Sequence, residues 1–148
     1  ARAERGRPGY QTYLLKAAVE FAKTKDANIA RQSIARVRGN PTDHTWRLSH
    51  AFLHAYEGHL GNAEGEYERA FENQVAPQAI LESETFIQDL LEEEPSKAEL
   101  WFCLGIINEV GKKDRKLAKE SYSKFLDHAG DRYSSQRQRA QSCIDQGS

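Results

Sequence analysis

The chain has 148 residues, 29% of them charged, and its acidic and basic side chains nearly cancel to a net charge of −1. This length suffices for one domain with a real core, and the balanced charge argues against a dedicated nucleic-acid binder. Two cysteines, Cys103 and Cys143, are too few for a disulfide framework, and no apolar run approaches the roughly 20 residues that cross a bilayer. We therefore expect a soluble domain with no direct membrane insertion.

The sequence predicts an all-α protein of seven to eight helices. Alanine, glutamate, lysine, arginine and glutamine are abundant, and the chain lacks the alternating β-branched runs that are typical of strands. Glycines and prolines divide it into segments that each carry apolar residues at helical spacing. In chain order, these apolar stripes span residues 10–21, 29–37, 46–55, 63–71, 80–91, 100–108, 117–126 and 133–144.

Capping and breaking residues predict where several of these helices begin. Asp43 is a candidate N-cap for the third helix, and Pro77 is suited to the first turn of the fifth. Ser96 and Glu99 have the spacing of a capping box for the sixth helix. Asp131 is the candidate N-cap of the eighth, more polar helix.

Residues 98–129 carry a repeat-like motif. The motif positions are occupied by Trp101, Leu104, Gly105 and Asn108, followed by Ala118, Tyr122 and Phe125. This stretch resembles a tetratricopeptide repeat, in which W-x-x-L-G-x-x-Y in one helix precedes A-x-x-x-F in the next. It departs from that pattern by one substitution, Asn108 for the tyrosine, and by one extra residue in the turn around Gly111. Two more degenerate copies, at residues 14–37 and 48–70, keep the spacing with substitutions or a shortened turn.

The resemblance implies a right-handed α-solenoid of antiparallel helix pairs. It covers residues 10–129, preceded by an N-terminal tail at 1–9. Residues 130–148 are similar to the polar capping helix and tail that close such arrays. The pairing of the fourth and fifth helices stays open, because the fourth can pair with either neighbour.

In tetratricopeptide arrays the first helices of successive pairs line a concave groove. Carried onto this chain, the resemblance implies a groove lined by Leu15, Val19, Lys23, Trp46, Ser49, Leu53, Tyr56, Phe102, Ile106 and Val110. An apolar lining favours a protein helix or peptide with apolar side chains, or a second copy of the chain as in a homodimer. We therefore expect a noncatalytic protein-binding scaffold, and leave open whether the fifth or eighth helix covers the groove.

A histidine-rich stretch in the third helix supports a competing hypothesis. His50 and His54 are four residues apart and share a helix face with Glu57. Two imidazoles and a carboxylate can ligate zinc, so the alternative is a metal-binding or hydrolytic protein that uses these residues. At about 100° per residue, however, the histidines point away from the apolar side that contains Leu48 and Phe52. We therefore expect them to face solvent, and predict no metal and no cofactor.

No catalytic arrangement is singled out by the sequence. Carboxylate pairs such as Glu92 and Glu93 are not joined to a nucleophile or a histidine at a suitable spacing. Cys103 lies in the apolar stretch WFCLGII, which favours a buried and unreactive thiol. We therefore predict that the chain is not an enzyme.

The ends of the sequence bear on its context. It begins at Ala1 and contains no methionine, so we expect a fragment of a longer protein. Because no signal-peptide pattern is present and the cysteines form no disulfide framework, the cytoplasm is the default expectation for its compartment.

Overall fold

The computed structural model describes residues 26, 29, 32, 44–73 and 75–146. Throughout this part of the chain every element is a helix. The elements are α3 (Trp46–Tyr56), α4 (Leu60–Glu72), α5 (Pro77–Glu93), α6 (Ala98–Ile106), the π-helical turn η1 (Ile107–Gly111), α7 (Arg115–Ala129) and α8 (Ser134–Asp145). The prediction of an all-α protein is confirmed for these residues, whereas the tail 1–9, the first predicted helix, most of the second, and Asp43 lie outside them.

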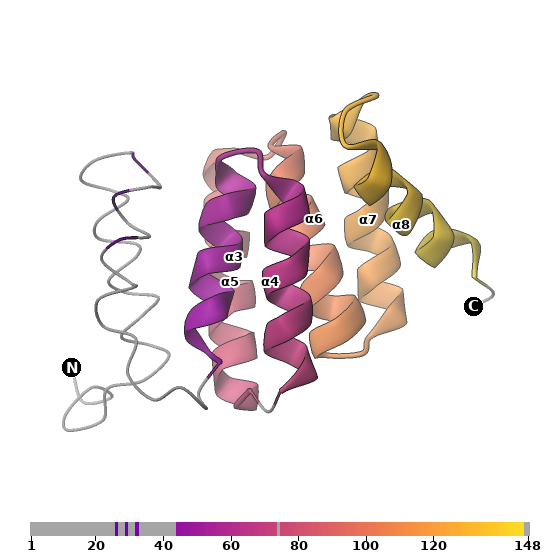
Figure 1. Ribbon diagram of the computed structural model, residues 1–148. Coiled ribbons are helices and arrows are strands. Elements are labelled where there is room, and N and C mark those ends of the chain that lie inside the picture. Colours follow the sequence, from indigo (N-terminus) through magenta and orange to yellow (C-terminus); the bar gives the residue numbers. More distant parts are fainter. Residues whose placement is uncertain (1–25, 27–28, 30–31, 33–43, 74, 147–148) are drawn as a thin grey trace, which may run out of the picture.

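The helices α3, α4, α6, α7 and α8 follow one another across the molecule, with α5 behind α3 (Figure 1). The most extensive contacts join α3 to α4 and α6 to α7. In addition, α6 contacts both α3 and α4, α7 contacts α8, and α5 packs on α6. The fourth helix therefore pairs with the third, and the fifth packs on the sixth.

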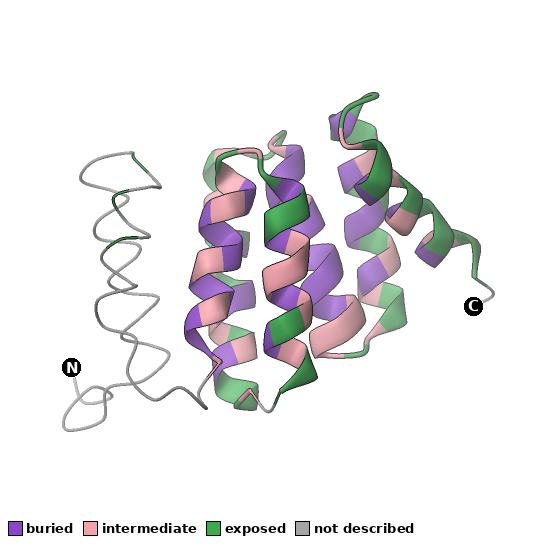
Figure 2. Cartoon of the chain, in the orientation of Figure 1, coloured by how far each residue is buried: buried purple, intermediate pink, exposed green. Residues whose placement is uncertain are grey.

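One hydrophobic core runs between the helices, and Figure 2 shows buried segments alternating with exposed ones along them. Its largest fully buried side chains are Tyr67, Tyr122, Phe52, Phe102, Phe125, Leu48, Leu53, Leu60, Ile87, Leu100 and Ile106. Burial of one such side chain contributes about 1.5–3 kcal/mol. The motif residues Tyr122 and Phe125 are thus core residues, as the sequence pattern predicts.

Gly105 marks the closest approach of α6 to α7. A Cβ atom at this position would lie 2.3 Å from Cε1 of Tyr122. The Tyr122 ring is itself held against Phe102, with ring centroids 6.0 Å apart. Packing therefore requires glycine here, because any side chain would displace the tyrosine ring.

Two predicted caps are wrong. Lys97, rather than Ser96, is the N-cap of α6, and it makes no side-chain capping hydrogen bond. Glu99 is buried and accepts a hydrogen bond from the hydroxyl of Tyr133 instead of capping its own helix. Tyr133, with φ 60°, also takes the N-cap position of α8 in place of Asp131. A tertiary contact between α6 and the start of α8 thus overrides the local capping pattern.

Other helix ends follow local rules. The prediction that Pro77 opens a helix is confirmed, since Pro77 is the first residue of α5. Asp114, which sequence analysis did not single out, caps α7 by accepting a hydrogen bond from the Leu117 amide at 3.1 Å.

Helix length also bears on membranes. The longest described helix, α5, has 17 residues, fewer than the roughly 20 that span a bilayer. Within the described ranges, no helix combines the length and the apolar character that a membrane span requires.

Candidate functional site

Most of the described residues of the predicted groove lining are buried. Leu15, Val19 and Lys23 lie outside the described residues. Of the others, Ser49, Leu53, Phe102 and Ile106 are at most 1% exposed and Trp46 is 8% exposed, whereas Tyr56 and Val110 are half-buried. The four apolar ones among these five, Trp46, Leu53, Phe102 and Ile106, belong to the hydrophobic core and present no open apolar surface.

Helix α5 lies against α3, and the residue that ends it reaches Tyr56 of this predicted lining. The ring of its Phe86 packs edge-on against Phe52 of α3, with centroids 4.9 Å apart. At its C-terminal end, the Tyr56 hydroxyl donates a 2.6 Å hydrogen bond to Glu94, and the Lys97 ammonium lies 4.1 Å from the Tyr56 ring centroid. Burial and the neighbouring Glu94 carboxylate raise the pKa of Tyr56 above its usual value. Of the arrangements left open by the sequence, coverage by the fifth helix fits these contacts.

The histidines of α3 lie beside α4 and are not solvent-facing, contrary to the prediction. Both His50 and His54 are half-buried, and Nε2 of His50 and Nδ1 of His54 are shielded from solvent. A ring nitrogen from each lies within 4.8 Å of the other and of a carboxylate oxygen of Glu66 on α4. Two imidazoles and a carboxylate therefore converge at the α3–α4 interface.

The expectation failed because α3 is buried on almost every side. Besides Leu48 and Phe52, it buries Ser49 and Leu53, because it contacts α4, α6 and Phe86 of α5. No face of this helix is left entirely to water.

Glu57, the carboxylate predicted from the sequence, belongs to a second group. A ligand atom from each of His54, Glu57 and His59 lies within 4.8 Å of the other two. Glu57 is already past the end of α3, and the His59 side chain is 59% exposed. His54 is common to both groups, whereas Glu66 has no sequence signal because it comes from the neighbouring helix.

Glu66 is held in place by Arg47. The guanidinium Nη1 of Arg47 lies 2.7 Å from Oε1 of Glu66, and its Nε donates a 2.9 Å hydrogen bond to Nδ1 of His44. The same guanidinium stacks over the Trp46 ring at 4.5 Å. A hydrogen-bonded arginine fixes the orientation of a carboxylate, so the position of Glu66 is determined by α3 as well as by its own helix.

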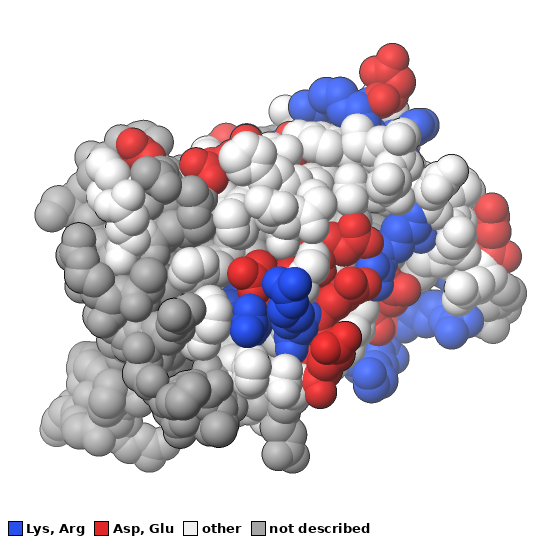
Figure 3. Space-filling view, in the orientation of Figure 1, with Lys and Arg blue, Asp and Glu red and all other residues white. Residues whose placement is uncertain are grey.

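A second polar cluster joins α4, η1 and α8. Arg139 Nη1 lies 2.6 Å from both Glu64 and Glu68, and its Nε lies 3.0 Å from Glu109. Glu109 also accepts a 2.6 Å hydrogen bond from Tyr122. Burial alone would lower the pKa of Arg139, but its hydrogen bonds to Glu68 and Glu64 raise it overall. Figure 3 shows acidic and basic side chains interleaved on this face.

These cluster residues were missed by sequence analysis. The one available signal was the i,i+4 spacing of Glu64 and Glu68, which places both carboxylates on one face of α4. The arginine that neutralises them, Arg139, is 75 residues from Glu64 and 71 residues from Glu68 along the chain.

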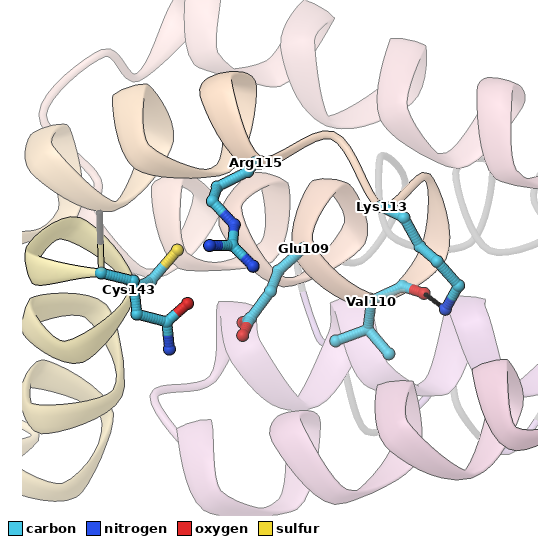
Figure 4. Close-up of a pocket in the computed structure, with 6 residues that line it drawn as sticks. Glu109, Val110, Lys113, Arg115 and Cys143 are labelled. Atoms are coloured by element: carbon cyan, nitrogen blue, oxygen red, sulfur yellow. Dashed lines mark hydrogen bonds between the residues drawn. The ribbon is translucent and has the colours of Figure 1, made fainter. Parts of the chain in front are cut away.

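A pocket of about 290 Å³ opens beside η1 (Figure 4). It is lined by Glu109, Val110, Lys113, Arg115, Cys143 and Gln146. Figure 4 shows the Arg115 and Glu109 side chains extending into the space in front of Cys143. Burial, followed by the charge of Glu109, raises the pKa of the Cys143 thiol, which disfavours a nucleophilic thiolate. The π-helical turn brings Glu109 and Val110 to this edge, so Val110 lines an open pocket rather than a long groove.

Cys103 is a buried thiol, as predicted. It is fully buried, and burial raises its pKa to about 12. The Tyr67 hydroxyl shares this environment, and its pKa is raised for the same reason. At neutral pH the Cys103 side chain is therefore a protonated, inaccessible thiol with the packing role of a small hydrophobic residue.

Comparison with known proteins adds no relative. No protein-family model, no curated protein and no solved structure matches this chain. Its function must therefore be argued from its own residues.

Proposed function

We propose that the chain is a noncatalytic protein-interaction module of the tetratricopeptide type. In this proposal seven to eight helices form a right-handed solenoid of antiparallel pairs, which binds a protein segment through apolar side chains. Such frameworks act by presenting a surface, and their chemistry is that of binding rather than bond breaking.

The observation that carries the proposal is the close crossing of α6 and α7 at Gly105. The motif glycine faces Tyr122, which occupies the aromatic position of the A-x-x-x-F half of the motif, at a distance that excludes even a methyl group. Phe125 lies on the same helix as Tyr122 and packs on Phe102 with ring centroids 5.3 Å apart. Small and aromatic residues in this register are what the repeat uses to close one helix pair.

The packing between pairs gives further support. Helix α6 contacts both members of the preceding pair, α3 and α4, and α7 contacts α8. Pairs that contact their sequence neighbours in this way are expected of a stacked array. Against this pattern, α5 is an additional helix laid over α3 and α6.

We place the partner surface on the outer side of α5. Because α5 lies against α3, a partner approaching that side meets α5 first. Leu81 lies in the first half of α5 and is 48% exposed, next to the half-buried Ile80. An exposed leucine on a helix can insert into an apolar partner, so Leu81 is the proposed anchor.

Peptide selection with the full chain as bait tests this function. A displayed peptide library should yield apolar, helix-forming binders whose affinity is then measured by fluorescence anisotropy. Leu81→Asp should weaken binding by about 10- to 100-fold, because burial of a leucine is worth about 1.5–3 kcal/mol. The matched control is Ser123→Asp, which adds the same charge at an exposed position of α7.

Three results would count against the proposal: selection without binders, equal effects of Leu81→Asp and Ser123→Asp, or turnover of a substrate that depends on His54. Light scattering over a range of concentrations distinguishes a self-associating module from a monomer that binds another protein. A homodimer would show an average mass that falls on dilution.

A further inference from the structure

We propose that His50, His54 and Glu66 form a binding site for a divalent transition-metal ion, and that zinc suits these ligands. The site would tie α3 to α4. It is independent of the proposed protein-binding surface, which lies on α5.

The spacing of the three donors fits one ion. His50 and His54 are one helical turn apart on α3, so both imidazoles leave the helix on the same side. Glu66 reaches them from the middle of α4. Their donor atoms lie within 4.8 Å of one another, whereas donors bound to one tetrahedral zinc at about 2.0–2.2 Å are about 3.4 Å apart. Small side-chain rotations therefore bring all three onto a single ion.

The chemistry of the donors selects the class of ion. Imidazole nitrogen suits zinc and its neighbours in the first transition series, whereas magnesium and calcium require mainly oxygen ligands. Two nitrogens and one carboxylate oxygen also leave a fourth tetrahedral position for water or a further group.

The surroundings hold the donors in place. The Trp46 ring meets the His50 ring edge-on, with centroids 5.1 Å apart and planes at 83°. Arg47 contacts Oε1 of Glu66 at 2.7 Å, and a carboxylate can keep such a hydrogen bond while an oxygen coordinates a metal. The positive charge of Arg47 opposes the ion, and the half-buried Glu66 carboxylate offsets one of the three positive charges.

The overlapping group of His54, Glu57 and His59 is the weaker candidate. The His59 side chain is 59% exposed, whereas that of Glu66 is 17% exposed. Fixing an exposed side chain on a metal costs more conformational entropy than using one that packing already restrains. The structure therefore favours Glu66 over Glu57, the carboxylate that the sequence suggested.

Titration of the full chain with Zn²⁺ by isothermal calorimetry tests the site. The expected result is one ion per chain with a dissociation constant in the micromolar range or below. His54→Ala and Glu66→Gln should each weaken binding by more than about 100-fold, beyond the 10- to 100-fold typical of groups that only orient a ligand. His128→Ala, at an exposed position of α7, should leave the constant within about twofold. Glu57→Gln, beside His54 but not assigned as a ligand, should weaken binding less than Glu66→Gln does.

A spectroscopic readout keeps the test independent of stability. Co²⁺ bound to these ligands should give the wild type visible absorption bands of a tetrahedral or five-coordinate site. Glu66→Gln, which is nearly isosteric, should abolish these bands. Its circular dichroism spectrum should stay the same as that of the wild type. Zinc binding no tighter than millimolar would overturn the proposal. Full retention of binding in Glu66→Gln, with its loss in Glu57→Gln, would overturn the assigned ligands.

Discussion

The α3–α4 and α6–α7 interfaces differ in what fills them. Between α6 and α7 the contact is made by aromatic rings, with Phe102 packed on both Tyr122 and Phe125. Between α3 and α4, half-buried polar groups of His54 and Glu66 meet beside a well-buried apolar core. Aromatic packing fills the first interface, whereas the second also contains the three donor groups of the proposed metal site. One pair contributes chiefly stability, and the other combines stability with chemistry.

The largest expected effect comes from the aromatic interface. Phe102→Ala should lower the free energy of unfolding by about 3–5 kcal/mol, because it removes a fully buried ring and leaves a cavity. Urea denaturation followed by circular dichroism measures the loss. Leu81→Ala, at the exposed position on α5, serves as the control and should change stability by less than about 0.5 kcal/mol. Equal losses in the two variants would contradict the assignment of Phe102 to the core.

A pair of glycine substitutions sharpens the contrast further. Gly105→Ala should destabilise the chain by about 1–3 kcal/mol, since the new methyl group would overlap the Tyr122 ring. Gly65→Ala in α4 has no atom within 4 Å of its new Cβ, so it should stabilise the chain by up to about 1 kcal/mol through helix propensity. Thermal unfolding of both variants gives the comparison. An unchanged or raised melting temperature in Gly105→Ala would show that α6 and α7 do not require glycine at their crossing.

A smaller effect is expected where α8 connects the two pairs. Arg139→Met removes the cation shared by Glu64 and Glu68 of α4 and by Glu109 of η1. The loss should be about 1–2 kcal/mol, because the three carboxylates are partly solvated but are left facing one another. Chemical denaturation gives the value, and Arg69→Met at an exposed position of α4 is the matched control. If the two substitutions cost the same, Arg139 does not bridge the pairs.

Local patterns in the sequence predicted the helices and part of the core. The spacing of Gly105, Tyr122 and Phe125 identified a helix pair, because the residues that these three contact in space are close to them in the sequence. Pro77 likewise marked a helix start through its own backbone geometry.

Long-range packing could not be predicted in the same way. Nothing near His54 in the sequence indicates that Glu66 approaches it from α4, and periodicity could not show that α5 would lie over α3. The capping box predicted at Ser96 does not form, and Glu99 instead accepts a hydrogen bond from Tyr133, which is 34 residues away along the chain. Each failure concerns a contact between helices, where tertiary context outweighs local preference.

Amide hydrogen exchange of the full chain, with and without Zn²⁺, tests the contrast between the two interfaces most directly. The account predicts that, among amides that exchange through local opening, zinc slows those in α3 and α4, which supply the ligands, and leaves those in α6 and α7 unchanged. Equal protection of both pairs by zinc, or no protection of α3 and α4, would contradict it.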